Sequence, residues 1–84
     1  MPTAIDPFLS AFGSHVRSLR KRAGLSQEET AHRAGIHVTY LSGVERGLRN
    51  PSIRNVRRLA LALGVPTREL FCFEDSPTGN SAND

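Results

Sequence analysis

The sequence predicts an all-α domain with five helices, and three observations support this fold class. Apolar residues recur every three or four positions in several stretches, which is the period of a helix with one buried face. The alternation of apolar and polar residues that indicates a half-buried strand is not found. Glycine, proline and serine separate the periodic stretches at the positions where helices end and begin. The 84 residues leave room for one compact domain with a small core.

The first helix is expected to begin near Asp6-Pro7, because Asp caps a helix N-terminus and Pro fits the first helical position. Gly13 lowers helix stability by about 1 kcal/mol relative to alanine. A start nearer Phe12 is therefore the alternative, and the helix is expected to end at Gly24. Its predicted core face consists of Phe8, Phe12, Val16 and Leu19.

Residues 25–47 predict two short helices joined by a tight turn. Ser26, followed three residues later by Glu29, forms a capping box, in which each side chain binds the backbone N–H of the other residue. Gly35 ends the second helix, since glycine adopts a positive φ without steric cost. Ile36 follows as a buried plug.

The third helix is expected from about His37 to Arg46, with Leu41 and Val44 facing inward and Gly47 at its end. Two short helices around one glycine turn are typical of a helix-turn-helix. In that motif the second helix enters the major groove of DNA.

A fourth helix is expected after Pro51, with Ser52 as its N-cap and Gly64 at its end. Its predicted apolar stripe is Ile53, Val56, Leu59, Ala60 and Leu63.

A fifth helix is expected at about residues 68–73, with Leu70 and Phe71 capping the core. From Glu74 onward the chain is polar and contains Pro and Gly, which predicts a disordered acidic and polar tail. The expected organisation is a DNA-binding domain at 1–73, with a dimerising C-terminal helix, and a tail at 74–84.

The positive charges are concentrated in the middle of the chain. All eleven Lys and Arg lie in residues 17–68, where the only acids are three glutamates, so this segment has a net charge of +8 against +3 for the whole chain. Such a basic segment with acidic flanks indicates a polyanionic partner, most simply nucleic acid. The alternative is that these basic residues only form a solvated surface that keeps the protein soluble.

Several separated blocks resemble the Xre/Cro/repressor family of bacterial and phage regulators. The resemblance extends over about residues 12–71, and within the family it is nearest to the controller proteins of restriction–modification systems. It implies a compact repressor-like helix-turn-helix domain that binds DNA. The matching blocks are GLSQEETA at 24–31, AGI at 34–36, YLSGVERG at 40–47, RNPSI at 49–53 and LALALGV at 59–65.

In this family an arginine of the first helix pairs with a glutamate of the recognition helix, and the matching residues here are Arg20 and Glu45. The physical case agrees, because Glu45 is the only acid between Glu29 and Glu69 and lies near two inward residues of its helix. A partly buried carboxylate needs a partner. We therefore expect a structural ion pair.

The resemblance places Val38, Thr39 and Ser42 at base-reading positions. Val38 departs from the controller proteins, which often carry a polar or basic residue there, but its methyls can pack on the methyl of thymine. The alternative is that Val38 and Thr39 are ordinary exposed helix residues with no role in DNA binding. The full expected DNA-binding set is Gln27, Val38, Thr39, Tyr40, Ser42, Gly43, Arg46, Arg49 and Asn50.

The other members of this set have different expected roles. Gln27 presents its amide and a helix N-terminus to a phosphate. Arg46 and Arg49 suit phosphate or guanine, and Gly43 permits close approach of the backbone. Two alternatives stay open: Tyr40 belongs to the core or contacts phosphate, and Asn50 shapes the Asn-Pro turn or contacts DNA.

One small domain covers few base pairs, so we expect a homodimer on a palindrome-like operator. Leu70 and Phe71 could instead complete the monomer core. The predicted interface is Leu61, Val65, Leu70, Phe71 and Phe73.

No other chemistry is indicated. The three histidines and Cys72 lack metal-ligand spacing, and the carboxylates are too scattered for acid–base catalysis. We expect no enzyme activity, metal, cofactor or small-molecule ligand. The chain has no membrane-spanning run or signal sequence and a single cysteine, which predicts a cytoplasmic protein.

The leading hypothesis is a homodimeric, sequence-specific transcriptional regulator that binds double-stranded DNA and controls restriction–modification genes and its own. The alternative is a protein-interaction module, such as an antitoxin or a coactivator-like adaptor. The operator, the regulated genes and the choice between activation and repression do not follow from the sequence.

Overall fold

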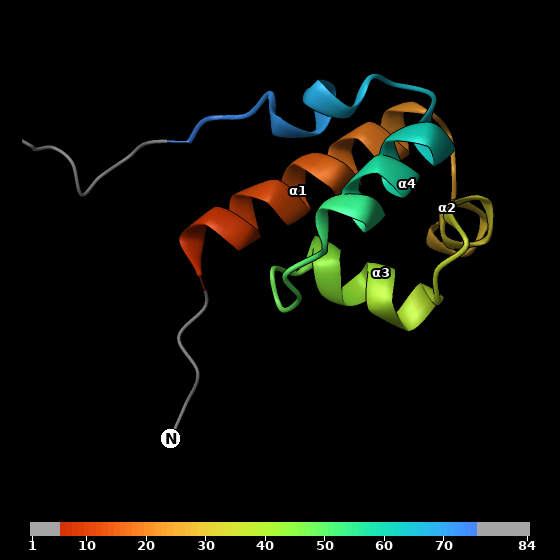
Figure 1. Cartoon of the computed structure of the whole chain (residues 1–84), viewed down its shortest axis with the longest axis horizontal. Helices are drawn as coiled ribbons and strands as arrows, with labels where there is room; N and C mark the ends of the chain where they lie inside the picture. Colours follow the sequence, from red (N-terminus) through yellow and green to blue (C-terminus); the bar gives the residue numbers. More distant parts are fainter. Residues whose placement is uncertain (1–5, 76–84) are drawn as a thin grey trace, which may run out of the picture.

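The computed structural model describes residues 6–75 and contains four α-helices and one 3-10 helix (Figure 1). No strand occurs within these residues, so the predicted all-α class is confirmed. The elements are α1 (Pro7–Arg22), α2 (Gln27–Ala34), α3 (Val38–Glu45), α4 (Ile53–Leu63) and η1 (Thr67–Phe71).

The helices enclose one apolar core. The longest helix, α1, packs against α3 and η1, while α2 packs against α3 and α4, and η1 also covers α4. Figure 1 shows α2 and α3 as short helices at one side of the longer α1 and α4. The largest fully buried apolar side chains come from four of the five elements: Val16, Leu41, Val44, Leu59 and Leu70.

Helix α1 begins earlier than Gly13 suggests. The Asp6 carboxylate accepts the backbone N–H of Phe8 at 2.8 Å, and the helix starts at Pro7, so the Asp6-Pro7 opening is confirmed and the alternative start nearer Phe12 was wrong. Gly13 is buried against α3, where an added Cβ would lie 2.7 Å from the Glu45 carbonyl oxygen. Glycine therefore serves close packing of two helices at this position.

The ends of α2 largely agree with the prediction. The Ser26 hydroxyl accepts the N–H of Glu29 at 2.9 Å, and Gly35 ends the helix with φ of 71°. The second half of the capping box is not formed, because the Glu29 carboxylate pairs with Arg33 one turn later at 3.2 Å. Ile36 is only partly buried against the core.

Two residues of the predicted core faces are exposed. Ile53 has 77% of its surface exposed and Phe8 has 43%, so their assignment to the core was wrong. Each lies in the first turn of its helix, where the beginnings of α1 and α4 line a shallow hollow. Ser52 nevertheless caps α4 as predicted, accepting the N–H of Asn55 at 3.1 Å.

In place of the predicted fifth helix at 68–73 the chain forms the 3-10 helix η1, which starts one residue and ends two residues earlier, so the described residues contain four α-helices and not five. Leu70 is fully buried, whereas Phe71 is 42% exposed and packs against Phe12 in a tilted arrangement, with ring centroids 5.4 Å apart. His15 ties η1 to α1 through a hydrogen bond of 2.7 Å between its Nε2 and the Glu69 carbonyl oxygen. The expected tail at 74–84 lies outside the described residues, apart from Glu74 and Asp75.

Candidate nucleic-acid interface

Helix α3 presents a polar face away from the core. Leu41, Gly43, Val44 and Glu45 are buried, so the outward side of the helix is formed by its first turn and by Ser42. Val38 and Thr39 are exposed in the first turn, and Ser42 follows one turn later, half-buried. The three expected base-reading residues thus lie on one side of a short helix.

Arg49 covers part of α3 after the chain turns back. Its guanidinium lies 5.9 Å from the centre of the Tyr40 ring, within reach of a cation–π interaction. Its side-chain stem lies over Gly43, where an added Cβ would be 2.7 Å from Cγ of Arg49. Gly43 is buried, so the expectation that it allows close approach of DNA was wrong. The glycine instead makes room for the arginine.

Tyr40 connects the recognition helix to α4. Its ring is partly buried against the core, and its hydroxyl accepts the side-chain amide N–H of Asn55 at 3.2 Å. The partly buried ring supports the core alternative for Tyr40, while a contact of its hydroxyl with phosphate stays a prediction. Asn50 is exposed in the loop between α3 and α4.

Arg20 and Glu45 form the ion pair expected from the sequence. Nε of Arg20 donates to Oε2 of Glu45 at 2.7 Å, and Nη2 donates to Oε1 at 3.1 Å. Nη1 donates to the carbonyl oxygen of Leu25 at 2.9 Å. The side chain of Glu45 is 2% exposed, so this bidentate ion pair is buried between α1 and α3.

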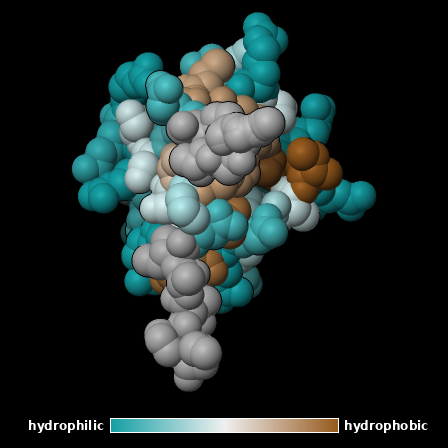
Figure 2. Space-filling view, turned by 90° about the vertical axis from the view of Figure 1, so that its left-hand side faces the viewer, coloured by the Kyte–Doolittle hydropathy of each residue, from teal (hydrophilic) through white to brown (hydrophobic). Residues whose placement is uncertain are grey.

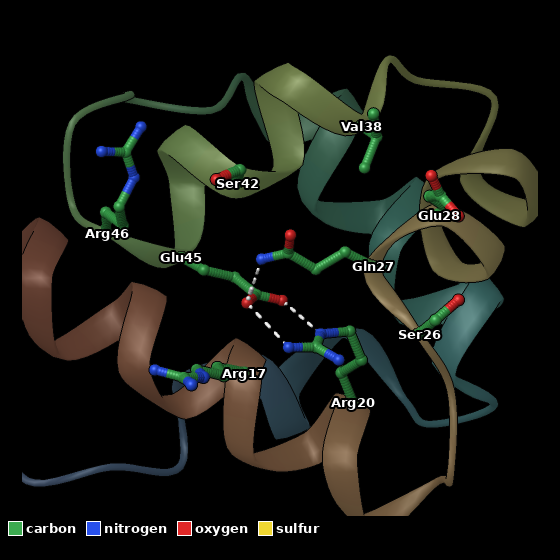
Figure 3. A pocket seen from close by; sticks show the side chains of 9 residues that line it. All are labelled: Arg17, Arg20, Ser26, Gln27, Glu28, Val38, Ser42, Glu45 and Arg46. Atoms are coloured by element: carbon green, nitrogen blue, oxygen red, sulfur yellow. Dashed lines mark hydrogen bonds and ion pairs between the residues drawn. The ribbon is translucent and has the colours of Figure 1, made fainter.

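Gln27 takes part in the same network, which the sequence did not predict. Its Nε2 donates to Oε1 of Glu45 at 2.9 Å (Figure 3). One of the two N–H donors of the amide expected to reach a phosphate is therefore directed at Glu45. The sequence indicated this contact only weakly. A buried glutamate can accept more hydrogen bonds than one arginine donates, so a further donor near Glu45 was to be expected, but nothing in the sequence identified it as Gln27.

A polar hollow of about 660 Å³ lies between α1, α2 and α3. Arg17 and Arg46 are exposed at the same end of it, as Figure 3 shows. Arg17 was not among the expected site residues, because its place beside α3 depends on how the helices pack. The residues that line the hollow are Arg17, Arg20, Ser26, Gln27, Glu28, Val38, Ser42, Glu45 and Arg46.

A second, apolar surface lies at the beginning of α1. Phe8, Ile53 and Phe71 are exposed around a shallow hollow of about 100 Å³, which Phe12 and Val56 also line. Figure 2 shows apolar side chains gathered at this end of the molecule, surrounded by hydrophilic ones. We call the exposed residues Phe8, Ile53 and Phe71 the apolar surface.

The predicted interface residues occupy different environments. Leu70 is fully buried in the monomer and is not available to a partner, so its assignment to the interface was wrong. Phe73 packs against Phe8 with ring centroids 5.8 Å apart, and Val65 packs against the core. Leu61 is 66% exposed on the outer side of α4.

Within residues 6–75 no group of three or more His, Cys, Asp or Glu is placed to hold a metal ion. None of the helices in this part of the chain is long and apolar enough to cross a membrane.

Comparison with known proteins matches most of the chain. A helix-turn-helix family model matches residues 16–70. Control protein C.BamHI of Bacillus amyloliquefaciens is 41% identical over 63 residues, covering 74% of this chain and 78% of that protein. An HTH-type transcriptional regulator of Sinorhizobium fredii, y4dJ, is 48% identical over 68 residues, covering 80% of this chain and 88% of that protein.

Solved structures give the same result. The crystal structure of the restriction-modification controller protein C.AhdI from Aeromonas hydrophila matches with a TM-score of 0.74 and 49% identity. The match covers 75% of this chain and 96% of that one. The wild-type controller protein C.Esp1396I matches with a TM-score of 0.73 and 29% identity, covering 79% of this chain and 87% of that one. The family resemblance predicted from the sequence motifs is confirmed.

Proposed function

This chain belongs to the helix-turn-helix family and is a DNA-binding transcriptional regulator; we propose that it binds a two-fold symmetric operator as a homodimer. We further propose that it controls the genes of a restriction–modification system, its own among them. The observation that supports operator binding is the polar outer face of α3 beside the exposed cations of Arg17 and Arg46.

Each part of this face has a proposed partner in DNA. Val38, Thr39 and Ser42 face the base edges of the major groove, where the valine methyls suit a thymine methyl and the hydroxyls suit either donors or acceptors. Arg17 and Arg46, which are exposed beside this face, are the proposed phosphate contacts. Base contacts would select the sequence, and phosphate contacts would hold the helix in place.

The apolar surface supports the homodimer. Three exposed large side chains beside an apolar hollow are unusual on a small monomer and mark a site for association. Ile53 projects next to the hollow, so two copies related by a two-fold axis could each place an isoleucine against the other's hollow. Of the interface predicted from the sequence, Phe71 belongs to this surface.

The proposed link to restriction–modification rests on the relatives. Two similar solved structures are of restriction-modification controller proteins, and they match across most of their own length. An adjacent methyltransferase and endonuclease gene would support the proposal, and their absence from the neighbourhood would contradict it.

The salt dependence of binding tests the operator proposal. Four to eight phosphate contacts per dimer would give a slope of roughly −4 to −7 for log K against log salt, at about −0.9 per contact. Fluorescence anisotropy with labelled duplex DNA measures this slope. A slope near zero would contradict DNA binding through the basic face and favour a protein-interaction module.

A further inference from the structure

We propose that the outer side of α1 binds the DNA backbone beyond each half-site of the operator, through a row of cations and hydroxyls that we call the α1 stripe. This inference rests on the proposed function, in which α3 enters the major groove and two copies share one operator. It adds a contact with flanking DNA, outside the bases that α3 would read. The α1 stripe consists of Ser14, Arg17, Ser18, Lys21 and Arg22.

Helical spacing places the α1 stripe on one side of its helix. From Ser14 to Lys21 its members recur every three or four residues, and Arg22 extends it into the end of α1. The buried residues of α1, among them Val16 and Leu19, face the other way. All five members of the stripe are exposed, and they line a hollow of about 620 Å³. The stripe is therefore open to a partner.

The positive charge of the α1 stripe is not neutralised by the described part of the protein. Helix α1 contains no acidic residue, and its remaining arginine, Arg20, is the one that Glu45 binds. Within residues 6–75 no carboxylate lies within ion-pair distance of Arg17, Lys21 or Arg22. Three positive charges close together on one helix face indicate a polyanionic partner.

A DNA strand fits this surface better than a protein does. Lysine, arginine and serine are common phosphate contacts, whereas the core of a protein interface is apolar and depleted in lysine. Within residues 6–75 this hollow is lined by serine, lysine and arginine. Arg17 and Lys21 are about 6 Å apart along the helix axis. One DNA strand carries a phosphate about every 3.4 Å of duplex axis, so a single strand can contact both cations.

Arg17 connects the α1 stripe to the proposed DNA interface. Its side chain lines both the hollow beside α3 and the hollow along α1. Figure 3 shows it at the same end of the first hollow as Arg46. Gly13 and Arg20 lie one turn before and after it and face α3, so Arg17 marks the edge between the two surfaces. A strand bound at Arg17 therefore passes directly onto the stripe.

The end of the α1 stripe lies far from the proposed two-fold axis. The apolar surface proposed for the homodimer is at the beginning of α1, where Phe8 lies in the first turn. Lys21 and Arg22 lie in the last turn, about 20 Å further along the helix. In a two-fold complex they therefore face the outer ends of the operator, where the DNA continues on each side.

Two duplexes of different length give the test, after the operator has been selected from a random library. The short duplex ends at the outer edges of the selected palindrome, and the long one adds about six base pairs on each side, which span about 20 Å. Wild-type protein should bind the long duplex more tightly, with a salt slope steeper by roughly 3 to 4. That change corresponds to Lys21 and Arg22 of two protomers, at about −0.9 per contact. Lys21→Ala/Arg22→Ala should bind both duplexes alike.

Arg57→Ala/Arg68→Ala is the matched control, because it removes the same charge from exposed arginines of α4 and η1. This variant should keep the gain from the flanking DNA. Methylphosphonates at the flanking positions remove the phosphate charge without shortening the duplex. They should weaken binding of the wild-type protein as shortening does, and they should not affect Lys21→Ala/Arg22→Ala.

Three results would overturn the inference while leaving operator binding intact. The first is equal binding of both duplexes by the wild-type protein, and the second is an equal loss on both duplexes by Lys21→Ala/Arg22→Ala. The third is a variant that melts at a lower temperature but keeps the gain from flanking DNA, as expected if these cations only stabilise the end of α1. If the wild-type protein enriches no sequence, the proposed operator recognition fails and this inference fails with it.

Discussion

Gly13 of α1 lies so close to Glu45 of α3 that a methyl group on the glycine would be 2.7 Å from the glutamate's carbonyl oxygen. The added carbon would also overlap the carbonyl oxygen of Val44. Backbone atoms cannot rotate away as a side chain does. The contact therefore sets the distance between α1 and α3, and with it the place of the recognition helix.

Gly13→Ala should destabilise the protein by about 1–3 kcal/mol, the usual effect of an overpacked core. At an ordinary helix position the same change stabilises by about 1 kcal/mol, so the sign of the effect is diagnostic. Urea unfolding followed by circular dichroism measures it. Ser14→Ala, at the exposed neighbouring position, is the control and should stay within about 0.5 kcal/mol of wild type. A stabilised Gly13→Ala would refute the close contact.

Glu45→Ala should cost about 3 kcal/mol or more, because it leaves the Arg20 guanidinium buried without its carboxylate. Unfolding of Arg20→Met, Glu45→Ala and the double variant should show strong coupling between the two residues. The exposed pair of Arg33 and Glu29 provides the matched cycle, with an expected coupling below about 0.5 kcal/mol. Additive losses in the buried pair would contradict its role.

Thr39→Ala and Arg46→Ala should affect DNA binding in different ways. Thr39 faces the base edges in the proposed complex, so its loss should cost roughly 1–3 kcal/mol on the operator and little on random DNA. Arg46 is assigned to a phosphate, which every sequence carries, so its loss should weaken both complexes similarly. Anisotropy titrations on both duplexes give the comparison. If the two variants lost affinity in the same way on both duplexes, the assignment of Thr39 to a base and of Arg46 to a phosphate would be wrong.

Ile53→Asp should shift the protein toward monomer, since it places a charge in the centre of the apolar surface. Sedimentation velocity over a range of protein concentrations detects this shift. Leu61→Asp is the matched variant, being exposed on the same helix two turns further along. Dissociation by Leu61→Asp with no effect of Ile53→Asp would place the interface on the outer side of α4.

Local chemistry made the helix boundaries predictable. Asp6, Ser26 and Ser52 each cap the helix that was expected to follow them, because a cap depends on residues within one turn. The ion pair of Arg20 with Glu45 was also predictable, since an acid alone among basic residues in a buried stretch needs a partner.

Contacts between distant segments were not predictable in the same way. The exposure of Ile53 depends on where the neighbouring helices stop, although the residue continues an apolar stripe. The burial of Gly43 depends on a side chain from the following loop, that of Arg49. The bond from Gln27 to Glu45 joins residues 18 positions apart on different helices. None of these depends on a local pattern of residue types.

The division of α3 into two faces affects how such a protein can evolve. Leu41 and Val44 hold the helix in the fold, while Val38, Thr39 and Ser42 take little part in the core. A duplicated gene could therefore acquire a new operator through a few changes on the outer face, without loss of foldability. Swapping only the outer residues of α3 between related regulators should then transfer operator choice.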